Sequence, residues 1–227
     1  MNRTNTENRY VQILSTGVQL EGMFSIPAEN PRGLVVFVHG SGSSRHSPRN
    51  QYVAQTLQEG GLATLLFDLL TADEEEIDLQ TRHLRFDIGL LANRTMGVLD
   101  WLDSQPYAQG LKRGLFGSST GAAAALIAAA EGPDKVDAVV SRGGRPDLAN
   151  KYLPNVQAPT LLIVGGNDEP VIDLNEYAIA QMRPGADKKL TIVPGASHLF
   201  EEQGTLEYAA RLAREWFQTY LSPVRVK

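Results

Sequence analysis

The chain has 227 residues, a formal net charge of −5 and no cysteine. This composition excludes a basic footprint for nucleic acid, a disulfide framework and a thiolate zinc site. With 42% hydrophobic and 21% charged residues, the sequence is typical of a soluble globular protein, and we expect residues 1–227 to form one α/β domain. The polar segment Met1–Arg9 lacks the apolar run of a secretory signal, and no stretch is apolar enough to span a bilayer. We therefore expect a cytoplasmic protein that does not contact membranes.

The N-terminal part of the sequence alternates apolar and polar residues, which is the period of a strand with one buried face. This pattern predicts strands over Tyr10–Leu14 and Val18–Ile26, joined as an antiparallel hairpin. The next apolar run, Leu34–Val38, has no polar face, as expected for a strand that is buried in a parallel sheet. A helix over Gln51–Glu59 then leads to a second buried strand over Ala63–Phe67.

The segment Thr71–Arg85 is the least regular part of the sequence. Its acidic run, Asp73–Glu76, and the basic residues that follow indicate a solvated excursion on the surface. Beyond this segment, apolar residues recur at helical spacing over Asp87–Leu102. We therefore expect a helix there, and an irregular surface segment before it that partly covers the site.

The second half of the chain repeats the order of strand and then helix. Strands are expected over Arg113–Phe116, Val136–Val140, Thr160–Val164 and Lys189–Val193, and helices over Ala122–Ala130, Asp173–Met182 and Leu206–Tyr220. This alternation predicts right-handed parallel crossovers, a sheet covered by helices on both faces, and functional loops at the carboxyl ends of the strands. The interval Ser141–Pro159 is too short for a helical cap domain, so an open or shallow site is expected.

A G-S-S-T-G pentapeptide, Gly117–Gly121, lies between a predicted strand and an alanine-rich helix. It has the G-x-S-x-G pattern of a nucleophile elbow, in which Ser119 would stand at the tip of a strained strand-to-helix turn. Ser119 has glycine two residues before and two residues after it, whereas Ser118 has Phe116 and Thr120 in those places. Because so tight a turn needs the space that glycine leaves, the sequence favours Ser119 as the nucleophile.

Three polar residues, Ser119, Asp168 and His198, each follow a different predicted strand. Because the carboxyl ends of parallel strands meet at one edge of a sheet, we expect these side chains to lie together, in the chain order known for one class of serine hydrolases. A serine hydroxyl needs a base to accept its proton during attack, which an imidazole can do. A carboxylate then holds the imidazole in the required tautomer. Glu169 and Asp173 are the alternative acids.

The developing oxyanion in such a mechanism needs backbone N–H donors. Thr120, the residue after the nucleophile, is expected to supply one donor at a helix N-terminus. The second is expected from Ser41, since Gly40 and Gly42 on either side let the backbone approach the substrate.

Arginines follow two of the expected site loops. Arg45 follows the oxyanion loop, and Arg142 and Arg145 follow the sixth predicted strand. A guanidinium can bind a carboxylate through two hydrogen bonds, so these residues are candidates for binding a substrate with a second acidic group. The alternative is that they form structural ion pairs with Asp147 or with the Glu74–Glu76 run.

Four short motifs extend across the chain: H-G-S-G at His39–Gly42, G-S-S-T-G at Gly117–Gly121, G-N-D at Gly166–Asp168 and G-A-S-H at Gly195–His198. Together they resemble α/β-hydrolases of the dienelactone hydrolase-like group, from about Gly33 to Phe217. The resemblance implies an eight-stranded, mostly parallel sheet and hydrolysis of a carboxylic ester. Dienelactone hydrolases proper use a cysteine nucleophile. Because this chain has Ser119 and no cysteine, serine esterases, thioesterases and acyl hydrolases of similar fold are at least as well supported.

The expected partner is a small-molecule ester or related thioester or lactone, with neither a cofactor nor a metal. The chain has no cysteine, no histidine pair at ligand spacing, and no phosphate-loop or dinucleotide-binding pattern. Two other function classes remain open. An acyltransferase or cofactor-free perhydrolase would use the same triad, and a non-catalytic binding protein on this fold would usually have lost part of it. The sequence indicates neither the acyl preference nor the oligomeric state.

Overall fold

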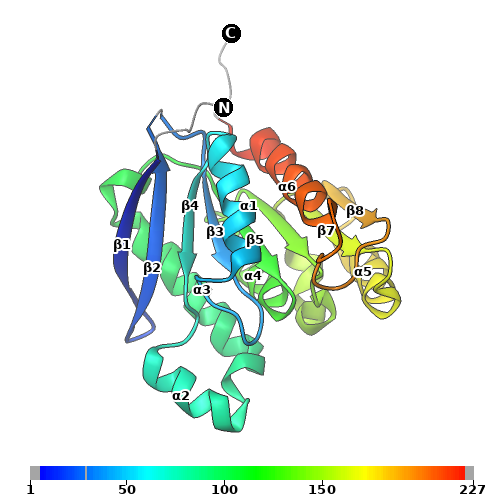
Figure 1. The fold of residues 1–227 in the computed structure, drawn as a ribbon, viewed down its shortest axis with the longest axis horizontal. Coiled ribbons are helices and arrows are strands. Elements are labelled where there is room, and N and C mark those ends of the chain that lie inside the picture. The colour runs from blue at the N-terminus through cyan, green and yellow to red at the C-terminus, as the bar shows by residue number, and fades with distance from the viewer. Residues whose placement is uncertain (1–5, 29, 223–227) are drawn as a thin grey trace.

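A single eight-stranded sheet organises the computed structural model, which describes residues 6–28 and 30–222 (Figure 1). Residues 1–5 of the polar N-terminal segment lie outside that range. The strands are β1 (Thr6–Ser15), β2 (Val18–Pro27), β3 (Leu34–Val38), β4 (Ala63–Phe67), β5 (Arg113–Ser118), β6 (Ala138–Arg142), β7 (Thr160–Gly165) and β8 (Lys188–Val193). Their order in the sheet is β1-β2-β4-β3-β5-β6-β7-β8. The hairpin β1–β2 pairs antiparallel with β4, and β3 to β8 run parallel, so the predicted eight-stranded, mostly parallel sheet is confirmed.

Helices cover both faces of the sheet. They are α1 (Pro48–Glu59), α2 (Ala72–Thr81), α3 (Ile88–Asp103), α4 (Thr120–Glu131), α5 (Glu169–Gln181) and α6 (Thr205–Leu221), with 3₁₀ segments η1 (Leu84–Phe86), η2 (Pro106–Ala108) and η3 (Pro146–Asn155). Apolar residues of α1 and α6 form one core layer, and those of α3, α4 and α5 form the other. Strand β3 contributes Val35 and Phe37 to the first layer and Val36 and Val38 to the second. Its uniformly apolar sequence thus reflects burial on both faces.

The predicted elements all exist, with shifted ends that have local causes. Helix α1 starts three residues early, because the Ser47 side chain accepts a hydrogen bond from the Asn50 N–H and Pro48 occupies the first turn. Strand β6 ends at Arg142 and not at Val140, since it pairs with β5 up to Ser118. Arg142 therefore ends a buried strand, where the sequence had placed it in a loop. Between β6 and β7 the chain forms only η3, and no cap domain is inserted there.

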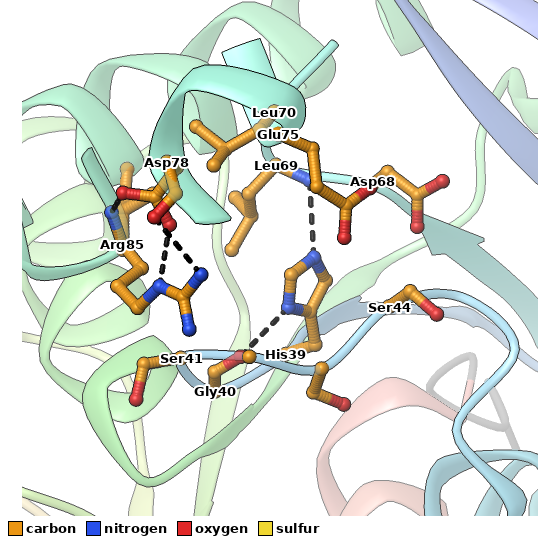
Figure 2. Close-up of a pocket in the computed structure, with 13 residues that line it drawn as sticks. His39, Gly40, Ser41, Ser44, Asp68, Leu69, Leu70, Glu75, Asp78 and Arg85 are labelled. Carbon is orange, nitrogen blue, oxygen red and sulfur yellow. Dashed lines mark hydrogen bonds and ion pairs between the residues drawn. The ribbon is translucent and has the colours of Figure 1, made fainter. Parts of the chain in front are cut away.

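The expectation of an irregular segment over Thr71–Arg85 is wrong, because most of it forms helix α2. A capping box begins this helix: Thr71 Oγ1 accepts the Glu74 N–H, and the Glu74 carboxylate accepts the Thr71 N–H. Asp78 is fully buried and pairs with Arg85, as Figure 2 shows. The T-x-x-E spacing of Thr71 and Glu74 is typical of a helix start, but the many charged residues around it favoured the interpretation as an irregular surface segment.

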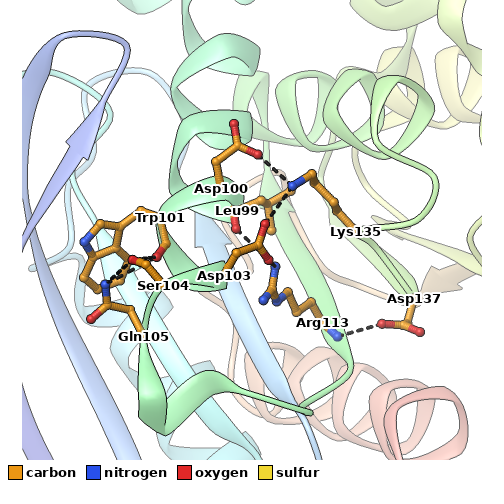
Figure 3. Close-up of polar contacts among 9 residues, drawn as sticks. All are labelled: Leu99, Asp100, Trp101, Asp103, Ser104, Gln105, Arg113, Lys135 and Asp137. Carbon is orange, nitrogen blue, oxygen red and sulfur yellow. Dashed lines mark hydrogen bonds and ion pairs between the residues drawn. The ribbon is translucent and has the colours of Figure 1, made fainter.

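The end of β5 opposite the pentapeptide is anchored by a polar cluster (Figure 3). Arg113, the first residue of β5, donates through its side chain to Asp103 at 2.7 Å and through its N–H to Asp137 at 2.8 Å. Lys135 also donates to Asp103, at 2.8 Å. Hydrogen bonds from Lys135 and then Arg113 hold the pKa of Asp103 below its usual value. These contacts tie the start of β5 to the end of α3.

No helix within residues 6–28 and 30–222 combines the length and the apolar character that a membrane span requires.

Candidate active site

Ser119 occupies a strained turn between β5 and α4. Its backbone has φ 50° and ψ −123°, in the positive-φ region that side chains other than glycine rarely adopt. Two hydrogen bonds, one with the end of β6 and one with the loop that follows it, hold this conformation. The Ser119 N–H donates to the Arg142 carbonyl at 3.3 Å, and the Arg145 N–H donates to the Ser119 carbonyl at 3.1 Å. The serine hydroxyl is thereby presented from a rigid backbone at the carboxyl edge of the sheet.

The two glycines of the G-x-S-x-G pattern lie where no side chain fits. A Cβ atom at Gly117 would lie 2.4 Å from the Ala122 Cα. At Gly121 it would lie 2.2 Å from the Val38 carbonyl oxygen and 2.3 Å from that of His39. All three distances are far below van der Waals contact. The pattern is therefore required by the close approach of the turn to its own helix and to the end of β3.

His198 and Asp168 lie in direct contact. Asp168 follows β7 and precedes α5, His198 lies in the loop after β8, and His198 Nδ1 is 2.7 Å from Asp168 Oδ2. Because a carboxylate only accepts hydrogen bonds, Nδ1 carries the proton, and in the neutral ring Nε2 is then free to act as a base. The alternative acids, Glu169 and Asp173, are both exposed on α5. A Cβ at Gly143 (φ 51°) would touch the imidazole at 3.6 Å, so the ring packs against this backbone.

Ser119 and His198 line a common pocket of about 240 Å³. Ser41, Arg49 and Arg142 also line it. Within the described residues, Ser119 and His198 are not hydrogen-bonded to each other, and contacts of this kind commonly close when substrate binds. The pocket thus brings the candidate nucleophile and the candidate base to one small polar space.

The two residues expected to form the oxyanion hole also lie together. Thr120 is the first residue of α4, so its N–H has no partner within the helix. The Ser41 N–H donates to Thr120 Oγ1 at 2.9 Å, a contact that the spacing did not predict. Gly40 brings the loop this close, since a Cβ there would lie 3.0 Å from the Ser118 carbonyl and 3.1 Å from the Ser119 Cβ.

His39 supports the loop from behind, which is a role that sequence reasoning missed. Its Nδ1–H donates to the Gly40 carbonyl at 2.9 Å, and its Nε2 accepts the Leu69 N–H at 3.1 Å (Figure 2). This pair of contacts requires a neutral ring, and burial lowers the pKa of His39. The sequence feature that could have indicated this role is the position of His39, a polar residue directly after the wholly apolar strand β3.

Replacing His39 by glutamine is expected to remove an acid-sensitive part of the stability. Because the pKa of His39 is lowered from 6.5 on folding, the unfolded chain binds the proton first. The free energy of unfolding therefore falls as the pH drops below about 6.5, by up to about 1.4 kcal/mol per pH unit. Glutamine can accept from Leu69 and donate to Gly40 without titrating. Urea unfolding at pH 7.5 and pH 5.5 measures this difference.

The exposed His46 provides the control for that measurement. His46→Gln should keep the wild-type difference between the two pH values, whereas His39→Gln should reduce it. An unchanged difference in His39→Gln would contradict the assignment.

A second, smaller pocket shares Gly40 and Ser41 with the pocket of Ser119 (Figure 2). Gly42, with φ 69°, lines this pocket, and a Cβ there would lie 3.4 Å from Arg85 Nη1. Asp78 of α2 lines it as well. The segment Thr71–Arg85 thus packs against the loop, but none of its residues lines the pocket of Ser119. The expected partial cover of that pocket is not observed, because residues of this segment line the second pocket instead.

The structure separates the three candidate arginines. Arg45 pairs with Asp68 and with Glu21, and Arg145 donates through Nε and Nη2 to Asp147 at 2.9 and 2.8 Å. Arg45 and Arg145 therefore form structural ion pairs. Arg142 alone among the three lines the pocket of Ser119. Within the described residues, no group of three or more His, Asp or Glu side chains is arranged to hold a metal ion.

Several known proteins are similar to this chain. The model of the Dienelactone hydrolase family matches residues 20–223. The crystal structure of the dienelactone hydrolase from Anabaena variabilis is 60% identical, with 95% of this chain and 99% of that chain covered and a TM-score of 0.92. Est1E from Butyrivibrio proteoclasticus is 18% identical, with 92% and 98% covered and a TM-score of 0.77, and shares the fold.

The chain also matches a protein from two strains of Mycobacterium tuberculosis named "Putative phosphoribosyl transferase". Identity is 56% over 211 residues, which are 93% of this chain but 46% of that protein. The chain therefore spans about half the length of these curated relatives.

These matches agree with the sheet order and the absence of a large cap between β6 and β7. They show an α/β-hydrolase fold. With a family model that matches residues 20–223 and a relative 60% identical along nearly its whole length, the chain belongs to the dienelactone hydrolase family.

Proposed function

We propose that this protein hydrolyses small carboxylic esters through an acyl-enzyme formed on Ser119. The observation that carries the proposal is the geometry of the site. Ser119 stands on a strained elbow and shares a pocket with His198, whose Nδ1 is 2.7 Å from Asp168. Membership of the dienelactone hydrolase family supports hydrolase activity.

In the first half of the proposed reaction, Ser119 Oγ attacks the ester carbonyl carbon while His198 Nε2 takes the hydroxyl proton. The bond from carbon to the alcohol oxygen then breaks, and His198 returns the proton to that oxygen. Water attacks the acyl-enzyme in the second half, again losing a proton to His198. The carbon–Oγ bond breaks, Ser119 regains its proton, and a carboxylic acid leaves.

The tetrahedral oxyanion would be stabilised by the N–H groups of Thr120 and Ser41. The Thr120 N–H lies at the N-terminus of α4, where the helix dipole favours a negative charge. The Ser41 N–H, which now donates to Thr120 Oγ1, would transfer this hydrogen bond to the oxyanion as the charge develops. Two N–H donors on adjoining backbone segments are what stabilisation of the oxyanion requires.

The pocket volume of about 240 Å³ favours a short substrate. A serine in place of cysteine does not favour dienelactones over other esters, thioesters or lactones. The name "Putative phosphoribosyl transferase" belongs to Mycobacterium tuberculosis proteins that are about twice as long as the region that matches this chain. We assign ester hydrolysis to the region that this chain shares with those relatives.

Labelling with a fluorophosphonate tests the proposal, because such reagents phosphonylate an activated serine. Peptide mass spectrometry should find the adduct on the peptide that contains Ser119. The adduct should be absent in Ser119→Ala and present in Ser118→Ala. Modification at another residue, or unchanged labelling in Ser119→Ala, would refute the mechanism.

A further inference from the structure

Arg142 is a buried cation without a counter-ion. It is only 6% exposed, and its Nε and Nη1 have no hydrogen-bond partner within the described residues. Its side-chain contact is the ring of Phe200, whose centroid lies 5.6 Å from the Arg142 Cζ. Burying a guanidinium without hydrogen bonds is costly, and most buried arginines are paired. The buried Arg94 also leaves its Nε and Nη1 without a partner, but its Nη2 donates to the Glu74 carboxylate at 2.7 Å, whereas Arg142 has no ion pair among the described residues.

The pocket around Arg142 is positive. No residue that lines it is Asp or Glu, and Arg49 is a second cation on its wall. Arg49 is partly exposed and pairs at 3.2 Å with Glu201, which is itself mostly exposed. Burial, and then the like charge of Arg49, lower the pKa of Arg142 to about 10, so the guanidinium remains protonated at neutral pH. An anion would therefore meet an unpaired positive charge in this pocket.

The position of Arg142 is fixed relative to the candidate nucleophile. It ends β6 beside Ser118, and its carbonyl accepts the Ser119 N–H at 3.3 Å. The side chain also lines the same pocket as Ser119 and His198. A substrate whose carbonyl reaches Ser119 would consequently place its other end within a short distance of the guanidinium.

We propose that Arg142, assisted by Arg49, binds an anionic oxygen group of the substrate, a carboxylate or a phosphate, so that the preferred esters carry a negative charge near the scissile bond. This inference rests on the proposed function of Ser119. A planar guanidinium offers paired donors that match two oxygens of such a group. The anion would supply the counter-charge that the buried guanidinium lacks, and this would explain why the protein keeps an unpaired cation there.

A matched pair of esters tests the proposal. The acidic ester is p-nitrophenyl hydrogen adipate, and the neutral ester is its methyl ester, in which the charge is masked at nearly the same length. We expect the wild-type protein to prefer the acidic ester in kcat/KM by roughly tenfold or more, as charge-assisted hydrogen bonds typically provide. In Arg142→Gln this ratio should fall by at least about tenfold.

Arg145→Gln is the matched control, since Arg145 already pairs with Asp147. It should keep the wild-type ratio of the two esters. Arg142→Lys, which retains the charge without the planar fork, should give an intermediate ratio. This second variant also keeps the test informative if Arg142→Gln does not fold. Competitive inhibition by adipate or by inorganic phosphate, each measured alone, distinguishes the two kinds of anion.

Two outcomes would overturn the anion site. One is a wild-type protein that shows no preference between the esters. The other is an Arg142→Gln protein in which both esters lose activity equally, which indicates a purely structural role. Failure of the proposed hydrolase function is distinguishable, because then neither ester is turned over. Calorimetric binding of adipate to the wild type, compared with Arg142→Gln, would then decide the anion site alone.

Discussion

Replacing Ser119 by alanine is expected to lower kcat/KM for ester hydrolysis by at least about a thousandfold, which corresponds to roughly 4 kcal/mol of transition-state stabilisation. The substitution removes the only atom that can form the acyl bond at the tip of the elbow. The oxyanion donors and the pocket would remain and supply the residual rate. Turnover of p-nitrophenyl acetate and butyrate by purified protein measures the loss.

Ser118→Ala is the matched control for this experiment. Ser118 is the neighbouring serine, but it ends β5 and is buried, with 5% of its surface exposed. Its variant should retain most of the activity. Because serine and alanine both carry a Cβ, the strain at φ 50° is the same in Ser119→Ala, and its thermal unfolding should match that of the wild type. Retention of most activity in Ser119→Ala would exclude Ser119 as the nucleophile.

Replacing Asp168 by asparagine is expected to cost about a thousandfold or more in kcat/KM at neutral pH, although the side chain keeps its shape. The amide nitrogen of asparagine can donate to His198 Nδ1, which would shift the ring proton to Nε2. The base would then face Ser119 already protonated. The same variant should react with fluorophosphonate far more slowly than the wild type.

Glu169→Gln and Asp173→Asn are the controls that separate Asp168 from the alternative acids. Both residues are exposed on α5, and the 2.7 Å contact to His198 belongs to Asp168. We expect both variants to stay within a few-fold of wild-type activity. Near-normal activity in Asp168→Asn, together with a collapse in either control, would transfer the role to the other acid.

Much of the fold follows from local sequence patterns. The alternation of Val18–Ile26 predicted a strand with one buried face, and the uniformly apolar Leu34–Val38 predicted a strand buried on both faces; both are observed. The missed helix was α2, where the charge of Asp73–Glu76 outweighed the capping signal of Thr71 and Glu74. Helix ends and strand ends were displaced by two to four residues where capping or pairing with a neighbour decided them.

For the candidate site, local sequence patterns indicate which residue types follow the strands and in which order. Ser119, Asp168 and His198 were placed at strand ends because the strand periodicity and the glycine spacing are local properties of the chain. Contacts between residues that are far apart in the chain are visible only in the tertiary structure. It showed which acid touches His198, that His39 joins the loop at Gly40 to Leu69, and that the Ser41 N–H meets Thr120.

The arginines show the same division. The sequence could state only that Arg45, Arg142 and Arg145 follow site loops. The partner of a long charged side chain depends on residues that the fold brings near it, such as Asp68, 23 residues away from Arg45. Only the packing of β6 between β5 and β7 buries Arg142 beside the elbow without a carboxylate. The sequence thus determined the fold and the candidate nucleophile, and the tertiary structure decided which charge remains available to a substrate.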